Sequence, residues 1–351
     1  MNCNKLVDMK IIIHSPLLKR LHSTNWILPW DNYCQSNNIE YVKVDLLKVD
    51  AINTIRDFDI LLWHFGQYNY TEMLEARSIL YCAKKMGLKV FPDFNESWHF
   101  DDKVAEMYAL QSVNAPIPES KVFYDMNTFE QWMASNPALP VVGKLRTGSG
   151  SHNVKLLKSK SALRDYAKRM FGKGYDPTPS LLYKTTSNLR SSHDWNTFKA
   201  KAKRVPEFLR VLAGAKKFPN ERGYVYLQEF IPNDGFDMKV VVVGNKLSGL
   251  YRPVRSHDFR ASGGGECLYN KELFTSNIIE SAFSVADALG VQCIGFDYVV
   301  NKDTGKGVIV EMSYGFSHSA VLGMGGYFDR DGVWYDKPLN VPEEIIRNML
   351  K

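Results

Sequence analysis

The fold is decided by the stretch IGFDYVVNKDTGKGVIVEMS, residues 294–313. Two apolar runs flank a polar segment that contains glycine, which is the pattern of an antiparallel hairpin. If Val300 pairs with Val308 across the loop 301–307, the same register places Asp297 opposite Glu311. Side chains in such a pair lie about 5 Å apart at Cβ, where two like charges repel. A cation is therefore expected between the two carboxylates.

A divalent metal ion would meet this requirement. The apolar neighbours of both acids indicate a buried strand pair, in which an uncompensated carboxylate is costly. Carboxylate oxygens suit Mg²⁺, which usually shares its coordination shell with nucleotide phosphates. The spacing leaves one alternative open, in which both acids face solvent or pair with lysine and arginine.

The residues before this hairpin also indicate antiparallel structure. Met238, Val240 and Val242 alternate along a predicted strand, and Gly244-Asn245 supplies a tight turn into a second strand, 246–254. A helix is expected at about 276–289, immediately before the decisive hairpin.

The first hundred residues follow a different pattern. Extended apolar runs at 10–13, 41–46, 59–65 and 89–92 alternate with helical stretches, including a helix at 70–86. This alternation predicts a parallel sheet with helices on its faces. No GxGxxG follows any of these strands, so the sequence does not predict a dinucleotide site here.

Two lysines of the middle region are candidates for binding phosphate. Lys144 ends the apolar strand 140–145 and precedes a loop of small residues, whose backbone N–H groups could fold over phosphates; an ordinary hairpin turn is the alternative. Lys103 begins a predicted helix, 103–113, and taken by itself would be a solvated lysine.

Positive charge is concentrated in residues 168–222, which hold 13 Lys or Arg against four acids, a net charge of +9. The segment, expected to be partly helical at 195–212, could attract an acidic polymer such as a uronic-acid saccharide or an acidic peptide. It could also be only a solvated flap. Few aromatic residues interleave with the charges, which argues against nucleic acid as a partner.

Downstream, Arg252, Arg255 and Arg260 lie close together in the sequence. Guanidinium groups bind carboxylate or phosphate through paired hydrogen bonds, so this arginine cluster is a candidate substrate site. A surface loop with salt bridges is the alternative.

Composition limits the classes of protein that remain. A chain of 351 residues exceeds the usual size of one core, so two or three subdomains are expected. Its five cysteines are scattered without a CxxC pair, and no apolar run approaches the ~18 residues of a membrane span, so we expect a cytoplasmic protein. No HExxH or GxSxG motif supports hydrolase chemistry. A small-molecule substrate and a homo-oligomer both remain compatible with the sequence.

Taken in order, these motifs resemble the ATP-grasp superfamily, most closely its ligases that add glutamate to ribosomal protein or peptide termini. The resemblance covers roughly residues 101–320. It is carried by Asp102-Lys103, Val-Val-Gly-Lys144 with its loop, Gln228-Glu229-Phe230-Ile231, Asp237-Met-Lys239, Arg252 with Asp258-Phe259-Arg260, Gly295-Phe296-Asp297 and Glu311-Met-Ser313.

The resemblance implies an α/β (α+β) ATP-grasp fold. A Rossmann-like pre-ATP-grasp domain would span residues 1–98. A central lid subdomain, which contains the basic insertion 168–222, would span 99–231. A C-terminal subdomain, which contains the metal site, would span 232–351. The two subdomains would clamp ATP.

The resemblance also implies a role for each motif. Arg252 and Arg260 would orient the acyl acceptor, and Arg255 is added because it lies near them. Asp297, Glu311 and Ser313 would hold one or two Mg²⁺ ions, for which Mn²⁺ could substitute. The residues implied to bind ATP are Lys103, Lys144, Thr147, Gly148, Ser149, Gly150, Ser151, Gln228, Glu229, Phe230, Ile231, Asp234 and Lys239.

The implied reaction activates a carboxylate as an acyl phosphate and joins it to an amine, with release of ADP and phosphate. Two departures from the family pattern stand out: Ser313 replaces the usual Asn, and the basic insertion lengthens the path from the glycine loop to the adenine linker. A kinase acting on a hydroxyl and a non-catalytic nucleotide-binding regulator are the alternatives.

Overall fold

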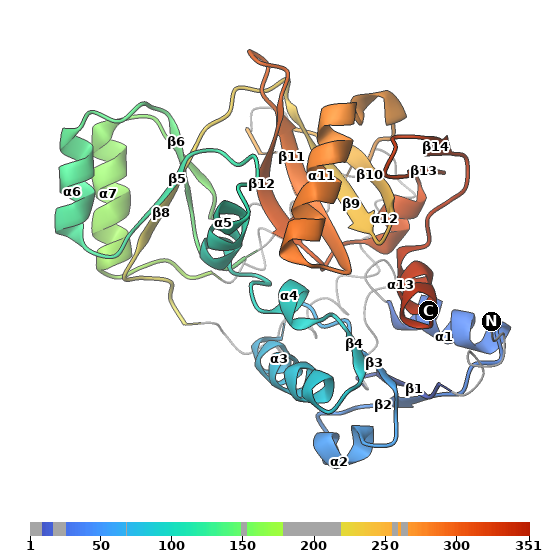
Figure 1. The fold of residues 1–351 in the computed structure, drawn as a ribbon. Helices are drawn as coiled ribbons and strands as arrows, with labels where there is room; N and C mark the ends of the chain where they lie inside the picture. Colours follow the sequence, from blue (N-terminus) through green and yellow to red (C-terminus); the bar gives the residue numbers. More distant parts are fainter. Residues whose placement is uncertain are drawn as a thin grey trace, which may run out of the picture.

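The computed structural model describes residues 9–16, 26–67, 69–148, 153–177, 219–254, 259–260 and 266–351, which form three sheets with helices packed on them (Figure 1). The arginine Arg255, the loop residues Ser149 to Ser151 and the predicted helix at 195–212 lie outside these residues. No helix among the described residues is long and apolar enough to cross a membrane.

The N-terminal unit is the parallel sheet that the alternating pattern predicts, with strand order β2-β1-β3-β4. Its elements are β1 Ile11–His14, α1 Ile27–Ser36, β2 Tyr41–Val44, α2 Ala51–Ile55, β3 Ile60–Leu62, α3 Tyr70–Lys85, β4 Lys89–Phe91 and α4 Phe94–Ser97. All residues of β1 and β3 are buried, as expected for parallel strands covered by helices on both faces.

The middle unit has an antiparallel sheet of order β5-β8-β6-β7 and a hydrophobic core of its own. Its elements are β5 Ser120–Phe123, α6 Met126–Ala134, β6 Val141–Lys144, β7 Lys155–Leu157, α7 Lys160–Phe171 and β8 Val225–Glu229. Figure 1 shows α6 and α7 side by side at the end of the molecule farthest from α13.

The C-terminal unit has a six-stranded sheet of order β12-β11-β9-β10-β13-β14. Its elements are β9 Phe236–Val243, β10 Lys246–Pro253, the 3₁₀ helix η3 Lys271–Leu273, α11 Ser276–Leu289, β11 Cys293–Val300, β12 Gly307–Ser313, α12 His318–Leu322, β13 Tyr327–Phe328, β14 Trp334–Tyr335 and α13 Val341–Met349. The predicted turn at Gly244-Asn245 is confirmed, because Val243 pairs with Lys246.

Helix α5, Lys103–Ser112, joins the middle and C-terminal units (Figure 1). Val104 and Met107 belong to the core of the middle unit, whereas Ala109 and Leu110 belong to the core that the N-terminal and C-terminal units share. The helix therefore fixes the position of the two units relative to one another.

The predicted pairing of Val300 with Val308 is wrong, although the prediction for the two acids is right. Val300 pairs with Gly307, so the strand starts one residue earlier than expected. A β-bulge next to Tyr298 then shifts the register by one residue and brings Asp297 opposite Glu311. A bulge adds one residue to one strand and turns the backbone there, and in this hairpin the extra residue is Val310.

Candidate functional site

Three neighbouring strands bring Asp297 and three other charged side chains together. Lys239 on β9 lies opposite Asp297 on β11, and its Nζ is 2.6 Å from Asp297 Oδ1. Arg252 on β10 lies opposite Asp237 on β9 and binds both of its carboxylate oxygens, at 2.7 and 2.8 Å. Arg252 also donates to Asp297 at 3.0 Å. We call these four residues the Asp297 network.

The cations of the Asp297 network compensate its buried acids. Only 5% of Asp297 is exposed. Burial by itself would raise the pKa of Asp297, but Lys239 and Arg252 outweigh it, so the pKa of this carboxyl lies below its usual range. For Arg252, burial works against the charge, yet Asp297 and Asp237 raise the pKa of the guanidinium above its usual value. Asp297 is therefore ionised and electrostatically satisfied.

A second group of charges surrounds Glu311 on the edge strand β12. Lys103 Nζ lies 3.4 Å from Glu311 Oε1, and Glu106 on the same helix accepts a hydrogen bond from the backbone N–H of Met312 at 3.4 Å. Lys144 on β6 also reaches this strand, at the carbonyl of Val310. We call Lys103, Glu106, Lys144 and Glu311 the Glu311 network.

Lys103 is buried, and not solvated as it would be if taken by itself. Only 7% of its surface is exposed, because α5 packs directly against β12. Burial opposes its charge, but Glu311, Glu106 and Asp101 more than offset this and raise the pKa of Lys103. The helix thus delivers a firmly cationic group to the junction of two units.

Lys144 is also buried, but its electrostatic environment differs. Its Nζ donates to Gln228 Oε1 at 2.7 Å and to the carbonyl of Val310, the extra residue of the bulge, at 3.0 Å. Burial lowers the pKa of Lys144 from 10.5 to about 8, and the positive charge of Lys103 adds to this effect, while Glu311 opposes it. A neighbouring anion would therefore stabilise the charged form of Lys144.

Both predicted metal-binding acids thus pair with cations, which is the alternative that the spacing left open. Asp297 pairs with Lys239 and Arg252, and Glu311 pairs with Lys103. Repulsion between the two acids consequently does not by itself require a metal ion. Among the residues that the structure describes, no group of three or more His, Cys, Asp or Glu side chains could hold one.

The third predicted metal ligand, Ser313, takes part in a local turn. Its hydroxyl accepts a hydrogen bond from the N–H of Gly315 at 3.0 Å. A hydroxyl has two lone pairs, so one oxygen acceptor site remains for another partner. Ser313 and the two carboxylates supply only oxygen donors, the type that fits Mg²⁺.

The base of the predicted phosphate loop is held by the segment before α5. Gly148 donates its N–H to Asp101 at 3.0 Å and accepts a hydrogen bond from Lys103 Nζ at 2.6 Å. Arg146 binds Asp102 at 2.7 Å, and Thr147 donates its hydroxyl proton to Glu221 at 2.8 Å. The start of the loop is therefore coupled to the same lysine that contacts Glu311.

The predicted adenine linker begins at the end of β8. Gln228 is buried and contacts Lys144, whereas Glu229 is exposed and Ile231 is buried again. Phe230 lies with its ring centroid 6.3 Å from that of Phe259, beside the arginine cluster. Asp234 is exposed.

The structure describes two members of the arginine cluster. Arg252 belongs to the Asp297 network, and Arg260 lies with its guanidinium 5.9 Å from the ring centre of Phe259. The structure therefore brings Arg252, Lys239 and Asp297 together on one sheet, and Arg260 lies on the segment that follows β10.

Two residues of the site, Glu106 and Asp237, were not predicted to have a role of their own. Glu106 follows Lys103 by three residues, a spacing that places both side chains on one helix face. The predicted turn at Gly244-Asn245 sets a register that also pairs Asp237 with Arg252. The sequence thus contained a signal for each, namely helical spacing and hairpin symmetry.

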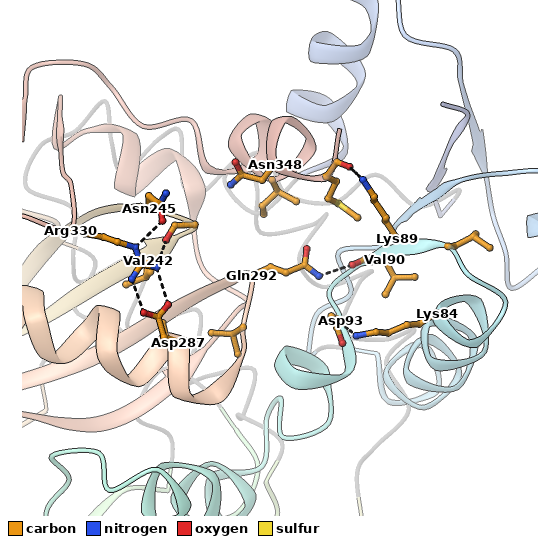
Figure 2. Close-up of a pocket in the computed structure, with 16 residues that line it drawn as sticks. Lys84, Lys89, Val90, Asp93, Val242, Asn245, Asp287, Gln292, Arg330 and Asn348 are labelled. Carbon is orange, nitrogen blue, oxygen red and sulfur yellow. Dashed lines mark hydrogen bonds and ion pairs between the residues drawn. The ribbon is translucent and has the colours of Figure 1, made fainter. Parts of the chain in front are cut away.

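A separate cleft of about 520 Å³ lies between the N-terminal and C-terminal units and is lined by none of the predicted site residues (Figure 2). Its charged side chains pair with each other: Arg330 binds Asp287 on one wall, and Lys84 binds Asp93 on the other. Gln292 spans the junction by donating to the carbonyl of Val90 at 2.9 Å. The Gln292 hydrogen bond joins the two units, whereas each ion pair lies within one unit.

Comparison with known proteins identifies relatives by structure alone. No protein-family model matches the sequence, and no curated protein is significantly similar to it. The structure is similar to that of a RimK domain protein ATP-grasp from Sphaerobacter thermophilus, with a TM-score of 0.55 and 17% identity over 97% of this chain and 100% of that one.

Two further solved structures agree with this result. D-alanine–D-alanine ligase from Bacillus anthracis, complexed with ATP, has a TM-score of 0.53 and 15% identity, covering 97% of this chain and 98% of that one. L-amino acid ligase from Bacillus licheniformis has a TM-score of 0.52 and 14% identity, covering 98% and 75%. At these identities the likeness establishes a common fold.

Proposed function

Because the chain has the ATP-grasp fold, we propose that it is an ATP-dependent ligase that joins a carboxylate to an amine through an acyl phosphate. One observation supports this proposal above the others. Buried lysines from α5 and β6 converge on the strand that carries Glu311, directly across the ribbon from Asp297. Cations and carboxylates from separate units are the groups that a metal-bound nucleotide requires.

In the proposed reaction, Lys103 and Lys144 bind the phosphates of ATP and offset the negative charge on the transferred phosphoryl group. The residues that would hold Mg²⁺ are Asp297, Glu311 and Ser313, and the bound ion would further neutralise phosphate charge. The small-residue loop after Gly148 covers the phosphates, and the adenine ring lies against the backbone of 229–231. Asp234 is the proposed ribose contact.

The substrate carboxylate attacks the γ-phosphorus, which forms the acyl phosphate and releases ADP. The amine then attacks the acyl carbon, and phosphate leaves as the amide forms. Arg252 and Arg260, with Arg255 outside the described residues, orient the acceptor and stabilise the oxyanion. Exclusion of water by the loop protects the acyl phosphate from hydrolysis.

Two of the similar structures are named as ligases of D-alanine and of L-amino acids, which supports small amino acids as the first substrates to test. An acidic saccharide or peptide is the second class, because the segment 168–222 carries a net charge of +9. Neutralising Lys199, Lys201, Lys203 and Arg204 together should raise KM for an acidic substrate at low salt and leave KM for a neutral amino acid unchanged.

The proposal is tested by a phosphate-release screen of paired acids and amines with MgATP, followed by mass spectrometry. The expected result is one free phosphate and one ADP for each amide formed, at a rate lowered on the order of 100-fold in the Lys144→Met variant. A phosphorylated product without free phosphate would identify a kinase instead. Binding of ATP with no turnover across amino acids and uronic acids would identify a regulatory protein.

A further inference from the structure

The structure leads to one inference about a residue that the ligase proposal does not use. We propose that Glu106 is a positioning residue, which holds the metal-binding strand β12 at a fixed place relative to the phosphate lysines. The inference rests on the proposed nucleotide role of Lys103, Lys144 and Glu311.

The argument begins with the position of β12 at the edge of its sheet. An edge strand presents backbone N–H and C=O groups that no neighbouring strand pairs. Here three such groups find partners outside the sheet. The N–H of Ile309 donates to the carbonyl of Pro116 at 2.7 Å, the carbonyl of Val310 accepts from Lys144 at 3.0 Å, and the N–H of Met312 donates to Glu106 at 3.4 Å.

These contacts replace a neighbouring strand with groups from the middle of the chain. Two of the three partners, Lys144 and Glu106, are side chains of the Glu311 network. The edge of the strand is therefore held by the residues that surround the proposed phosphate site, so a shift of β12 would disturb both together.

Glu106 and Lys103 hold adjacent points of the strand. They lie three residues apart on one face of α5, and they contact Met312 and Glu311 respectively. Met312 is also the residue between the proposed metal ligands Glu311 and Ser313. Two contacts from one helix fix both the position and the direction of this short segment, which a single contact would not.

Burial makes Glu106 an unusual residue to find in this position for packing alone. Only 3% of it is exposed, and it lies near the like charge of Glu311. A buried carboxylate is costly, and an apolar side chain would fill the same space without that cost. The hydrogen bond to Met312 supplies a reason for a side chain with an acceptor oxygen of this length.

The test separates the reach of the side chain from its charge. Glu106→Gln keeps the length and an acceptor oxygen but cannot ionise, whereas Glu106→Asp keeps the carboxyl group but is one methylene shorter. The matched controls are the same two changes at Glu344, another buried helical glutamate, which contacts Lys246 at 2.7 Å far from the site. Binding of a fluorescent ATP analogue is measured against Mg²⁺ concentration, with unfolding temperatures recorded for every variant.

We expect E106D to raise the Mg²⁺ concentration for half-maximal nucleotide binding by about tenfold or more, as for other residues that orient metal ligands. E106Q should stay within about threefold of the wild type, because its amide oxygen still accepts the Met312 N–H. The Glu344 variants should leave the Mg²⁺ requirement unchanged, even where they lower the unfolding temperature as much as E106D does.

Three results would overturn the positioning role: an unchanged Mg²⁺ requirement in E106D, an effect of E106Q as large as that of E106D, or an equal effect of the Glu344 variants. Failure of the ligase proposal looks different, because the wild type would then bind the Mg²⁺–nucleotide complex without forming an amide. A wild type that binds no nucleotide would overturn both.

Discussion

The two acids that face each other across the β11–β12 ribbon lie in contrasting electrostatic environments. Asp297 sits on an inner strand between Lys239 and Arg252, which compensate it within one sheet. Glu311 sits on the edge strand, and its cation Lys103 comes from a helix that joins two units. The side chain of Glu311 is 32% exposed, whereas that of Asp297 is 8% exposed.

This difference indicates that Asp297 and Glu311, although they face each other, contribute differently to stability and to binding. The Asp297 network is a structural set of ion pairs, since each charge has a partner from an adjacent strand. The Glu311 network contains a lysine of lowered pKa and a glutamate, Glu106, whose pKa burial and Glu311 raise well above its usual value. Such perturbed groups are typical of sites where ligands bind. Both networks contain proposed binding residues, but stability should depend more on the first, and binding of the nucleotide phosphates more on the second.

The largest expected effect tests the structural side of this comparison. Asp297→Ala should lower the free energy of unfolding by about 3–5 kcal/mol, because it leaves Lys239 buried without its counter-charge and removes one of the two carboxylates that bind Arg252. Urea denaturation followed by circular dichroism measures the change. Asp287→Ala, which removes an exposed partner of Arg330, is the control and should cost at most about 1 kcal/mol. Equal losses in the two variants would contradict the assignment of Asp297 to a buried structural network.

The second prediction concerns the ligand-binding side. Lys144→Met should lower the rate of ADP formation on the order of 100-fold, because the transferred phosphoryl group loses a preorganised cation. The unfolding free energy should fall by less than in Asp297→Ala, since a buried charge is removed and only the neutral acceptors Gln228 and Val310 lose a donor. Steady-state kinetics and urea denaturation give the two values. A variant that is unstable but retains its kcat would reverse the roles of the two networks.

The third prediction follows from the pKa of Lys144, which burial lowers to about 8 in the folded protein. Lys144 loses its proton as the pH rises through this value, so nucleotide affinity should fall by up to about tenfold between pH 7 and pH 9.5. Lys144→Arg keeps its charge over this range and should show a flat profile. Isothermal titration calorimetry with a non-hydrolysable ATP analogue checks both.

The same lowered pKa has the opposite consequence for stability. The unfolded chain keeps this proton up to about pH 10.5, so between the two values it binds more protons than the folded protein. The contribution of Lys144 to the unfolding free energy should therefore rise with pH in this window, relative to Lys144→Met. A contribution that falls would mean that the lysine is not desolvated in the free protein.

The smallest expected effect concerns Ser313, which stands where the ATP-grasp pattern usually has Asn. Ser313→Asn should tighten Mg²⁺ binding in the presence of nucleotide by about threefold, less than 1 kcal/mol, because the amide oxygen is a longer and better-placed ligand. The local hydrogen bond to Gly315 limits the gain. Mn²⁺ relaxation titrations measure the change, and weaker binding would exclude Ser313 from the metal site.

Much of the secondary structure follows from local sequence. The predicted helix at 276–289 is confirmed residue for residue as α11, and the parallel sheet of the first hundred residues is confirmed with small shifts at the strand ends. Local pattern suffices in these places for two reasons. Burial of one helix face leaves a period of 3.6 residues, and burial of both faces of a strand leaves a short continuous apolar run. The β-bulge at Val310 leaves no such signature, and that is why the predicted pairing of Val300 was one residue wrong.

The candidate site could be predicted only in part. Asp297, Glu311 and Lys144 come together as expected, since hairpin symmetry and a strand end are visible in the chain itself. The burial of Lys103 was not predictable, because it depends on α5 packing against a strand some 200 residues later. The pairing of Arg252 with Asp297 likewise depends on a contact between strands that are far apart in the sequence.

The sequence by itself determined that a β-ribbon would carry one acid on each of its strands, because two apolar runs flank a loop that contains glycine. The β-bulge that sets Asp297 opposite Glu311 belongs to the structure. Only the tertiary structure decided which cation each acid meets, since Lys239, Arg252 and Lys103 arrive from other strands and from a helix. The physical reason is that charge compensation acts through space at a few ångströms, and sequence separation carries no information about it.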